Sequence, residues 1–261
     1  MKQAIITGAS KGLGKALAHQ LAAMGYDLLL VARSEKMLAD LAQQITATYK
    51  VKATSLALDL SDTKSSGAIY SWCEQNQFNP SVLINNAGYA CWGFFESMPI
   101  DQQEKMIQVN TGSLVNLTHT MLPLLKRQPA AYIMNIASTA AYQAVPTMAL
   151  YAASKAFVKS FSRGLRYELR NTNVSVTCVS PGPMSTNFIQ QAGMEAMQET
   201  AKKFEMPAEV VAKKGLKAMF NKKSESIPGA VNYLTVKFSN ILPDALLEKI
   251  AANLYLTKLK P

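Results

Sequence analysis

Short, uninterrupted apolar runs alternate with stretches of helical periodicity, and this alternation constrains the fold more than any other feature of the chain. Runs of strand length occupy residues 2–7, 27–32, 51–58, 81–85, 131–137 and 174–179. Helices are expected between them, at residues 13–24, 34–49, 62–75, 101–125 and 150–170. Strands that are apolar throughout and alternate with helices are typical of a parallel sheet covered on both faces. We therefore predict an α/β fold built on a doubly wound parallel sheet.

Composition excludes several other classes of protein. Hydrophobic residues make up 49% of the 261 residues and charged residues 17%, which is typical of a globular protein rather than a disordered one. No apolar run approaches the roughly 18 residues that a membrane span needs, and the first apolar run is too short for a signal peptide. We therefore expect a cytoplasmic protein. Three cysteines without a Cys-x-x-Cys pair and two isolated histidines predict neither a disulfide framework nor a metal site.

The net charge of +10 is concentrated towards the C-terminus. From Lys202 onwards eleven lysines face five acidic residues. Such an excess suits an anionic ligand, an acidic carrier protein or a lipid headgroup surface, although a well-solvated lysine-rich surface is the favoured interpretation. No nucleic-acid-reading motif accompanies the charge, so no nucleic-acid partner is expected.

A glycine-rich turn separates the first predicted strand from the first predicted helix. Its spacing is Gly-x-x-x-Gly-x-Gly, within Thr7-Gly8-Ala9-Ser10-Lys11-Gly12-Leu13-Gly14. On the first strand-to-helix turn of an α/β fold, glycines allow a tight turn and a close approach of backbone to a pyrophosphate, which the helix N-terminus attracts. A plain tight turn is the alternative. The residues expected to bind a dinucleotide here are Gly8, Ser10, Lys11, Gly12, Leu13 and Gly14.

The end of the second predicted strand indicates which dinucleotide is bound. An NAD site expects an acidic residue at this position to hold the ribose 2′-hydroxyl, whereas an arginine accommodates a 2′-phosphate. This chain has Arg33 and no carboxylate there, and Lys11 adds a second cation from the glycine turn. The sequence therefore predicts NADP(H) as the cofactor, preferred over NAD(H) by at least roughly tenfold.

Tyr151 and Lys155 lie four residues apart on a predicted helix, so their side chains share one face. A lysine charge about 4 Å from the phenol, at an effective dielectric of about 20, would favour the phenolate by roughly 4 kcal/mol. That would lower the tyrosine pKa from about 10 to about 7, near the optimum for a general acid at neutral pH. On its own this spacing is weak evidence for a proton-donating pair, because two unrelated residues on an exposed helix turn often have it.

Taken together, these motifs resemble the short-chain dehydrogenase/reductase family over roughly residues 2–187. Five parts occur in the family's order, and Asn110 and Pro181-Gly182 extend the match. The five parts are Thr7-Gly8-x-x-x-Gly12-x-Gly14, Asp59, Asn85-Asn86-Ala87-Gly88, Ser138 and Tyr151-x-x-x-Lys155. The resemblance implies a Rossmann-like fold in a single domain over 1–261. It would comprise a dinucleotide-binding core at 1–180, a substrate loop and helices at 181–228, and a C-terminal helical extension at 229–261.

The resemblance also implies roles for individual residues. Ser138 would hydrogen-bond a substrate carbonyl, Tyr151 would protonate it, and Lys155 would hold the nicotinamide ribose and lower the tyrosine pKa. Asn110 would kink its helix and relay protons through a water, with a purely structural role as the alternative. Thr139 is an alternative hydroxyl to Ser138, and a helix cap is an alternative role for Thr186. The further cofactor contacts implied are Asp59, Leu60, Asn86, Ala87, Gly88, Pro181, Gly182 and Thr186.

The segment after Pro181 is rich in methionine and other apolar residues, and it contains no arginine or histidine between Met184 and Thr200 that would grip a small carboxylate. Its apolar residues, with Met148 ahead of Tyr151, are Met184, Phe188, Ile189, Met194, Met197 and Met206. They suggest a hydrophobic substrate pocket, with ordinary helix packing as an equal alternative. Apolar residues recur at helical spacing beyond Gly229. We expect them to dock against the protein or a second subunit in preference to a membrane surface.

The sequence therefore predicts an NADPH-dependent carbonyl reductase that acts on an apolar ketone such as a 3-oxoacyl chain. The family resemblance implies a homo-oligomer (dimer or tetramer). Two alternatives remain. One is a dehydrogenase that oxidises a secondary alcohol, since Tyr151 and Lys155 serve either direction. The other is a non-catalytic NADP(H)-sensing or scaffold protein, which usually lacks part of the proton-transfer set that is present here.

Overall fold

A single parallel sheet of seven strands, in the order β3-β2-β1-β4-β5-β6-β7, organises the part of the chain that the computed structural model describes: residues 2–185, 192–202, 204–239 and 241–259. The strands are β1 (Gln3–Thr7), β2 (Asp27–Ala32), β3 (Ala53–Ala57), β4 (Val82–Asn85), β5 (Ala131–Ile136), β6 (Val174–Val179) and β7 (Glu225–Ser226). Every neighbouring pair runs parallel. The predicted doubly wound α/β fold and its first six strands are confirmed. The seventh strand was missed, because two residues carry no readable pattern.

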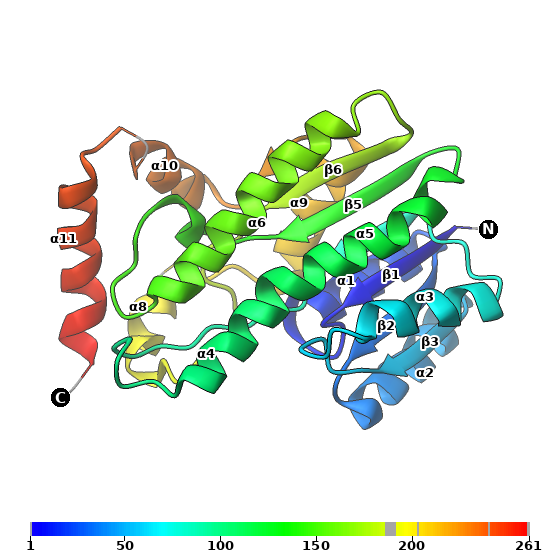
Figure 1. Cartoon of the computed structure of the whole chain (residues 1–261), viewed down its shortest axis with the longest axis horizontal. Coiled ribbons are helices and arrows are strands. Elements are labelled where there is room, and N and C mark those ends of the chain that lie inside the picture. The colour runs from blue at the N-terminus through cyan, green and yellow to red at the C-terminus, as the bar shows by residue number, and fades with distance from the viewer. Residues whose placement is uncertain (1, 186–191, 203, 240, 260–261) are drawn as a thin grey trace.

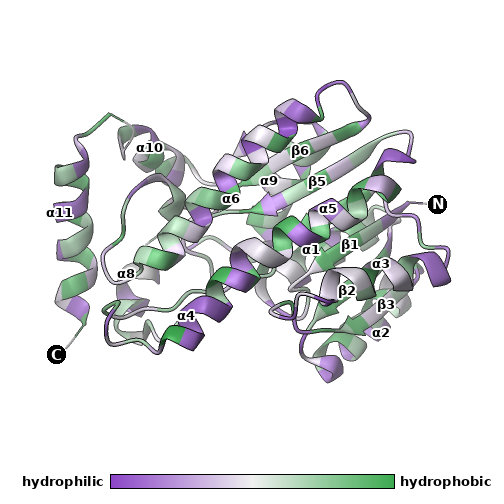
Figure 2. Cartoon of the chain, viewed as in Figure 1, coloured by the Kyte–Doolittle hydropathy of each residue, from purple (hydrophilic) through white to green (hydrophobic). Residues whose placement is uncertain are grey.

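Helices cover both faces of the sheet (Figure 1). On one face α1 (Gly12–Ala23), α2 (Glu35–Tyr49) and α9 (Ala208–Phe220) pack on a buried cluster that includes Ile6, Leu30 and Ile84. On the other face α3 (Ser65–Gln75), α5 (Ser113–Lys126) and α6 (Ala149–Glu168) cover Ile5, Leu29 and neighbouring side chains. Successive strand residues thus point to opposite layers, which is why the strands are apolar throughout. Figure 2 shows the same pattern, with hydrophobic strands between helices that turn a polar side outward.

The helix predicted at residues 101–125 is interrupted in the structure. It consists of α4 (Ile100–Ile107), a π-helical turn at Gln108–Gly112 and α5. Single π-helical turns inside longer helices are rare and occur frequently at functional sites. This turn contains Asn110, so the regular α-helix is interrupted at the residue where the family resemblance implied a kink.

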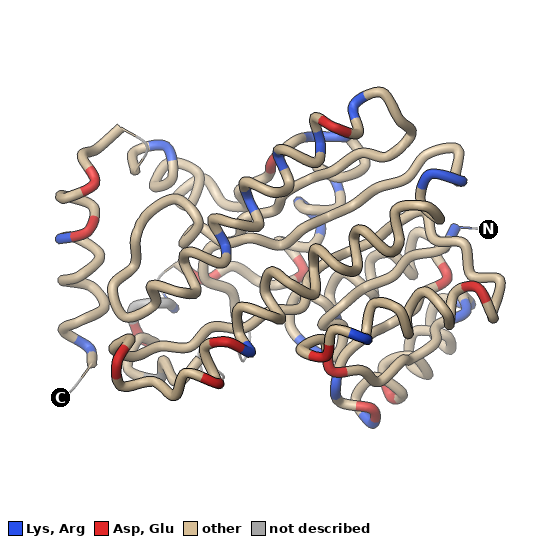
Figure 3. The backbone as a smooth tube through the Cα atoms, in the orientation of Figure 1, with Lys and Arg blue, Asp and Glu red and all other residues tan. Residues whose placement is uncertain are grey.

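The C-terminal extension is helical, as predicted, and lies at the end of the molecule opposite the N-terminus (Figure 1). It consists of α10 (Ala230–Ser239), α11 (Asp244–Tyr255) and a 3-10 turn at Leu256–Lys258. Smaller helical turns precede it at Thr139–Tyr142, Glu195–Met197 and, as α8, Gln198–Lys202. Basic residues recur along α6 in Figure 3, whereas acidic and basic residues are mixed on α11. None of the described helices combines the length and apolarity needed to cross a membrane.

Candidate active site

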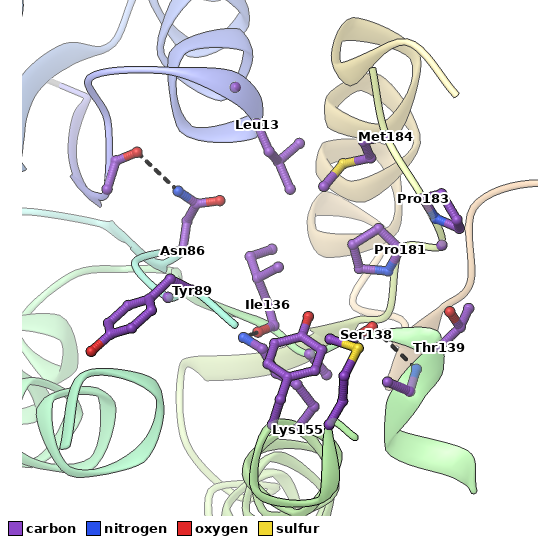
Figure 4. A pocket seen from close by; sticks show the side chains of 18 of the residues that line it. Leu13, Asn86, Tyr89, Ile136, Ser138, Thr139, Lys155, Pro181, Pro183 and Met184 are labelled. Carbon is purple, nitrogen blue, oxygen red and sulfur yellow. Dashed lines mark hydrogen bonds between the residues drawn. The ribbon is translucent and has the colours of Figure 1, made fainter. Parts of the chain in front are cut away.

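A cavity of about 590 Å³ opens at the carboxyl ends of the strands. The strand order reverses between β1 and β4, and ligands of open α/β sheets bind outside the carboxyl ends at such a switch point. Its wall is formed by the turn after β1, by the segments that follow β2 to β6, and by α6, α10 and α11. Figure 4 shows Leu13 and Asn86 on one side of this cavity and Pro181 and Met184 on the other. Residues far apart in the sequence therefore share one binding space.

The glycine turn is packed too closely for larger residues. Gly8 has a φ of +64°, and a Cβ placed on Gly14 would lie 2.1 Å from the carbonyl oxygen of Gly8. Asn86 fastens the turn from the neighbouring strand, because its Nδ2 donates to the carbonyl oxygens of Thr7 at 2.9 Å and Gly8 at 3.1 Å. The first turn of α1 is thereby held against the end of β1. The backbone of the glycine turn between them faces the cavity. A dinucleotide pyrophosphate fits this cradle.

The residues expected to select the nucleotide lie along the same wall. Lys11 and Arg33 both line the cavity, with Ser34 beside Arg33 at the end of β2. Asp59 also lines it, and its Oδ1 accepts a hydrogen bond from the Ser61 backbone N–H at 2.9 Å. That bond, together with the nearby charge of Arg33, holds the pKa of the Asp59 carboxyl below its usual range. This end of the cavity therefore presents two exposed cations and one anchored carboxylate to a bound nucleotide.

Ser138 stands directly after β5, where the chain enters a 3-10 turn. Its Oγ accepts a hydrogen bond from the backbone N–H of Ala140 at 3.1 Å, which caps the turn and fixes the side chain. Because that bond occupies an acceptor site, the hydroxyl proton of Ser138 remains able to donate. Ser138 also forms a hydrogen bond with the Tyr151 hydroxyl, which works to lower the pKa of Tyr151. The two hydroxyls that the sequence predicted to act together are thus brought together.

Tyr151 and Lys155 lie one turn apart on α6, and both are buried in the cavity wall. The Nζ of Lys155 lies 5.8 Å from the centre of the Tyr151 ring and donates a hydrogen bond to the carbonyl oxygen of Ile136 at 3.0 Å. Figure 4 shows this bond, which ties the lysine to the end of β5. The ammonium is therefore held beneath the phenol on the same helix face, as the four-residue spacing predicts.

The expected lowering of the tyrosine pKa to about 7 is wrong for this structure. Burial raises the pKa of Tyr151 to about 12, the hydrogen bond with Ser138 opposes that rise, and the nearby Tyr255 phenol adds to it. Burial also lowers the pKa of Lys155 to about 8. The physical reason is desolvation, which disfavours the charged form of each group and is the largest cause of both pKa shifts. At neutral pH the site therefore holds a neutral phenol above a protonated amine.

Asn110 is buried and does not line the cavity. Its Oδ1 accepts from the backbone N–H of Tyr89, and its Nδ2 donates to the Tyr89 carbonyl and to the Ser154 hydroxyl, each at 3.0 Å. Ser154 in turn donates to the carbonyl oxygen of Tyr151 at 2.7 Å. Asn110 thus joins the segment after β4 to the first turn of α6 and positions Tyr151. Its proton-relay role stays a prediction.

The structure places most of the predicted site residues in the cavity wall. Those that line it are Gly8, Ser10, Lys11, Gly12, Leu13, Arg33, Asp59, Leu60, Asn86, Ala87, Gly88, Ser138, Tyr151, Lys155, Pro181 and Gly182, together with Thr139. Gly14 supports the wall from behind, and Thr186 lies outside the described residues. Of the apolar residues assigned to the substrate end, Met148, Met184, Met194 and Met197 line the cavity. Met206 does not, and Phe188 and Ile189 are not described.

Sequence reasoning missed the contribution of the C-terminal helices. Cavity residues from these two helices are Val231, Asn232, Thr235, Val236, Ser239, Leu254 and Tyr255. The helical spacing beyond Gly229 predicted the helices but not which side of them faces the cavity. The signal was present in the four-residue spacing of Leu247, Ala251 and Tyr255, which places all three on one face.

The chain is similar to known proteins over most of its length. The family model described as short chain dehydrogenase matches residues 2–197. The chain is 33% identical over 193 residues to very-long-chain 3-oxoacyl-CoA reductase-A of Danio rerio, an alignment that covers 72% of this chain and 59% of that protein. It therefore spans less than two thirds of the length of that relative.

Solved structures share the fold. A short-chain dehydrogenase from Sphingobium yanoikuyae in complex with NADPH matches with a TM-score of 0.81 at 27% identity, covering 92% of this chain and 94% of that one. A short chain dehydrogenase/reductase from Burkholderia phymatum in complex with NAD matches with a TM-score of 0.84 at 24% identity, covering 90% and 92%. The two neighbours hold different nucleotides.

Proposed function

Since this chain belongs to the short chain dehydrogenase family of oxidoreductases, we propose that it is an NADPH-dependent reductase that converts the carbonyl of an apolar ketone to a secondary alcohol. One observation carries this proposal: Ser138, Tyr151 and Lys155 line the same cavity as the glycine turn. A carbonyl bound between the hydroxyls of Ser138 and Tyr151 would therefore lie in the same cavity as the cofactor.

When bound, NADPH supplies the hydride for such a reduction. The glycine turn, with Asn86 behind it, would hold the pyrophosphate, and Lys11 and Arg33 would hold the 2′-phosphate. Ser138 donates a hydrogen bond to the substrate carbonyl oxygen, which orients the carbonyl and stabilises the negative charge that develops there. These residues bind and orient both reactants in one cavity.

Tyr151 supplies the proton. Its phenol is neutral at pH 7, so the hydroxyl can transfer a proton to the developing alkoxide, which is a stronger base than a phenolate. The Lys155 ammonium, fixed to the Ile136 carbonyl, stabilises the phenolate that this transfer leaves. The raised pKa keeps Tyr151 in its protonated form but makes it a weaker acid, and the charge of Lys155 offsets this by stabilising the phenolate.

The pH dependence of reduction should report the charge of Lys155. Its pKa is about 8, so the ammonium is present below pH 8 and is lost as the pH rises, while Tyr151 with a pKa of about 12 stays protonated. We expect kcat/KM for ketone reduction to be level from pH 6 to 7 and to fall as the pH rises through 8. In Lys155→Arg the guanidinium keeps its charge, so any remaining activity should lose this alkaline fall. An identical fall in that variant would contradict the assignment.

The nucleotide preference should depend on Arg33. We expect wild-type protein to bind NADPH at least about tenfold more tightly than NADH, as measured by fluorescence titration. Arg33→Ala removes a charge-assisted contact worth about 1.5–3 kcal/mol, so NADPH binding should weaken by roughly 10- to 100-fold while NADH binding changes little. Arg170→Ala, at the exposed end beyond α6, is the matched control. Tighter binding of NADH to the wild type, or equal weakening of both nucleotides, would contradict the proposal.

The substrate class rests on the wall opposite the glycine turn. It includes Met148, Met184, Met194 and Met197, whose flexible thioether chains suit an adaptable apolar site. The similarity to a 3-oxoacyl-CoA reductase supports 3-oxoacyl thioesters as candidates.

We propose in addition that the chain forms a homo-oligomer, since members of this family commonly do and Phe238, Ile241 and Ile250 are more than half exposed.

The experiment that tests the function is NADPH consumption against a panel of ketones. The panel should contain aliphatic, aromatic, steroid and 3-oxoacyl carbonyl compounds, with a small hydroxy-acid precursor such as pyruvate as the polar control. We expect turnover with apolar ketones and none with pyruvate. No NADPH consumption with any ketone would favour the non-catalytic alternative.

A further inference from the structure

Helix α11 contacts the rest of the molecule through a narrow stripe. Leu247 and Ala251 are its buried residues, and Tyr255 follows four residues later on the same face, partly buried. The adjacent apolar stripe of Leu246 and Ile250 is exposed. The helix is therefore oriented so that one face, which ends at Tyr255, points into the protein.

The buried stripe ends in the substrate part of the cavity. Tyr255 lines the cavity together with Ser138 and Tyr151, and it packs against a buried cluster that contains Tyr151, Met148 and Met194. Its phenol is close enough to affect the ionisation of Tyr151, and burial raises the pKa of Tyr255 itself. The ring therefore lies beside the group that would protonate the substrate, not at a remote rim.

The neighbouring helix α10 is fixed to the same wall. The Nδ2 of Asn232 donates to the carbonyl oxygen of Pro228 at 2.9 Å, and the Asn232 side chain lies so close to Gly182 that a Cβ there would meet it at 2.5 Å. Val236 and Ser239 on α10 also line the cavity. The two C-terminal helices thus form part of the cavity wall next to the segment that follows β6.

We propose that Tyr255 determines substrate specificity: its ring, carried by α11, forms the wall beside the reacting carbonyl and limits the bulk of the substituents that fit there. The inference rests on the proposed function, because it takes the ligand to be a ketone. Removing the ring would enlarge the site locally. A slim ketone would lose contacts, whereas a ketone with a bulky group beside the carbonyl would gain room.

A binding experiment without turnover tests this inference. Protein saturated with NADP⁺ is unable to reduce a ketone, so dissociation constants of 2-octanone and benzophenone are measurable by calorimetry. We expect Tyr255→Ala to shift the ratio of the two constants by at least tenfold in favour of benzophenone. Tyr255→Phe keeps the ring and should leave the ratio within about threefold. Ile250→Ala, on the exposed stripe of the same helix, is the control and should leave it unchanged.

The outcomes separate the two proposals. An unchanged ratio in Tyr255→Ala, or equal weakening of both ketones, would overturn the specificity role, since general loosening of α11 affects both ligands alike. Failure of both ketones to bind the wild type would also overturn it. The expected shift in ratio without NADPH consumption in the panel assay would retain Tyr255 as a ligand-selecting residue and reject the reductase function.

Discussion

Replacing Tyr151 by Phe is expected to reduce kcat for ketone reduction by about 10²- to 10⁴-fold, the usual contribution of a positioned general acid. The substitution removes the hydroxyl group, whose proton would be transferred. It keeps the buried ring, which packs with Met148 and Met194. The glycine turn and Arg33 are untouched. Affinity for NADPH should therefore remain within about threefold of wild type.

Steady-state kinetics and a fluorescence titration of NADPH check the two halves of this prediction. Tyr255→Phe is the matched control, because it removes a second phenolic hydroxyl from the same cavity. That variant should keep kcat within about threefold. A Tyr151→Phe enzyme within tenfold of wild-type turnover would show that the proton comes from another group, and Ser138 would be the first candidate.

Replacing Gly14 by Ala is expected to abolish tight NADPH binding. The added Cβ would lie 2.1 Å from the carbonyl oxygen of Gly8 and 2.7 Å from the Nδ2 of Asn86. The Gly8 carbonyl belongs to the turn and Asn86 holds the turn from the end of β4, so both have to move, and the hydrogen bonds from Asn86 to Thr7 and Gly8 are lost with them. We expect NADPH affinity to fall by at least about 100-fold, or 2.7 kcal/mol. Overpacking should also cost about 1–3 kcal/mol of unfolding free energy.

Gly67→Ala is the matched control for that substitution. Gly67 is exposed on α3, and a Cβ there meets no atom within 4 Å. Because alanine is the better helix former, this variant should gain about 0.5–1 kcal/mol of stability and bind NADPH normally. Denaturant unfolding and cofactor titration of both variants provide the measurement. Normal NADPH affinity in Gly14→Ala would contradict the role of the turn as a pyrophosphate cradle.

The sheet was predictable because its strands are long, apolar and regularly spaced. β7 was not, since Glu225 and Ser226 join the sheet only by pairing with Cys178 and Val179 at the end of β6. The π-helical turn at Gln108–Gly112 has a similar explanation. Helical periodicity continues through it in the sequence, and Asn110 at its centre makes tertiary contacts with Tyr89 and Ser154. Features that depend on tertiary contacts leave no periodic signal.

The candidate site, like the fold, was predictable from the sequence only in part. Its motifs placed the glycine turn, Ser138 and Tyr151 around one cavity, since parallel strands bring their carboxyl ends to one edge of the sheet. The protonation chemistry was mispredicted, because a pairwise estimate from Tyr151 and Lys155 contains no term for burial, which dominates both pKa values. Tyr255 was missed because the packing of α11 decides which of its apolar stripes faces inward.

Isotope transfer tests the central claim most directly. Wild-type protein would be given NADPH that carries deuterium at the transferable position of C4, together with a ketone that it consumes, and the product would be analysed by mass spectrometry. If the protein is a reductase of this kind, the product is a secondary alcohol with one deuterium on the former carbonyl carbon and hydrogen from solvent on its oxygen. NADPH bound in the cavity with no deuterium passed to any ketone would contradict that function.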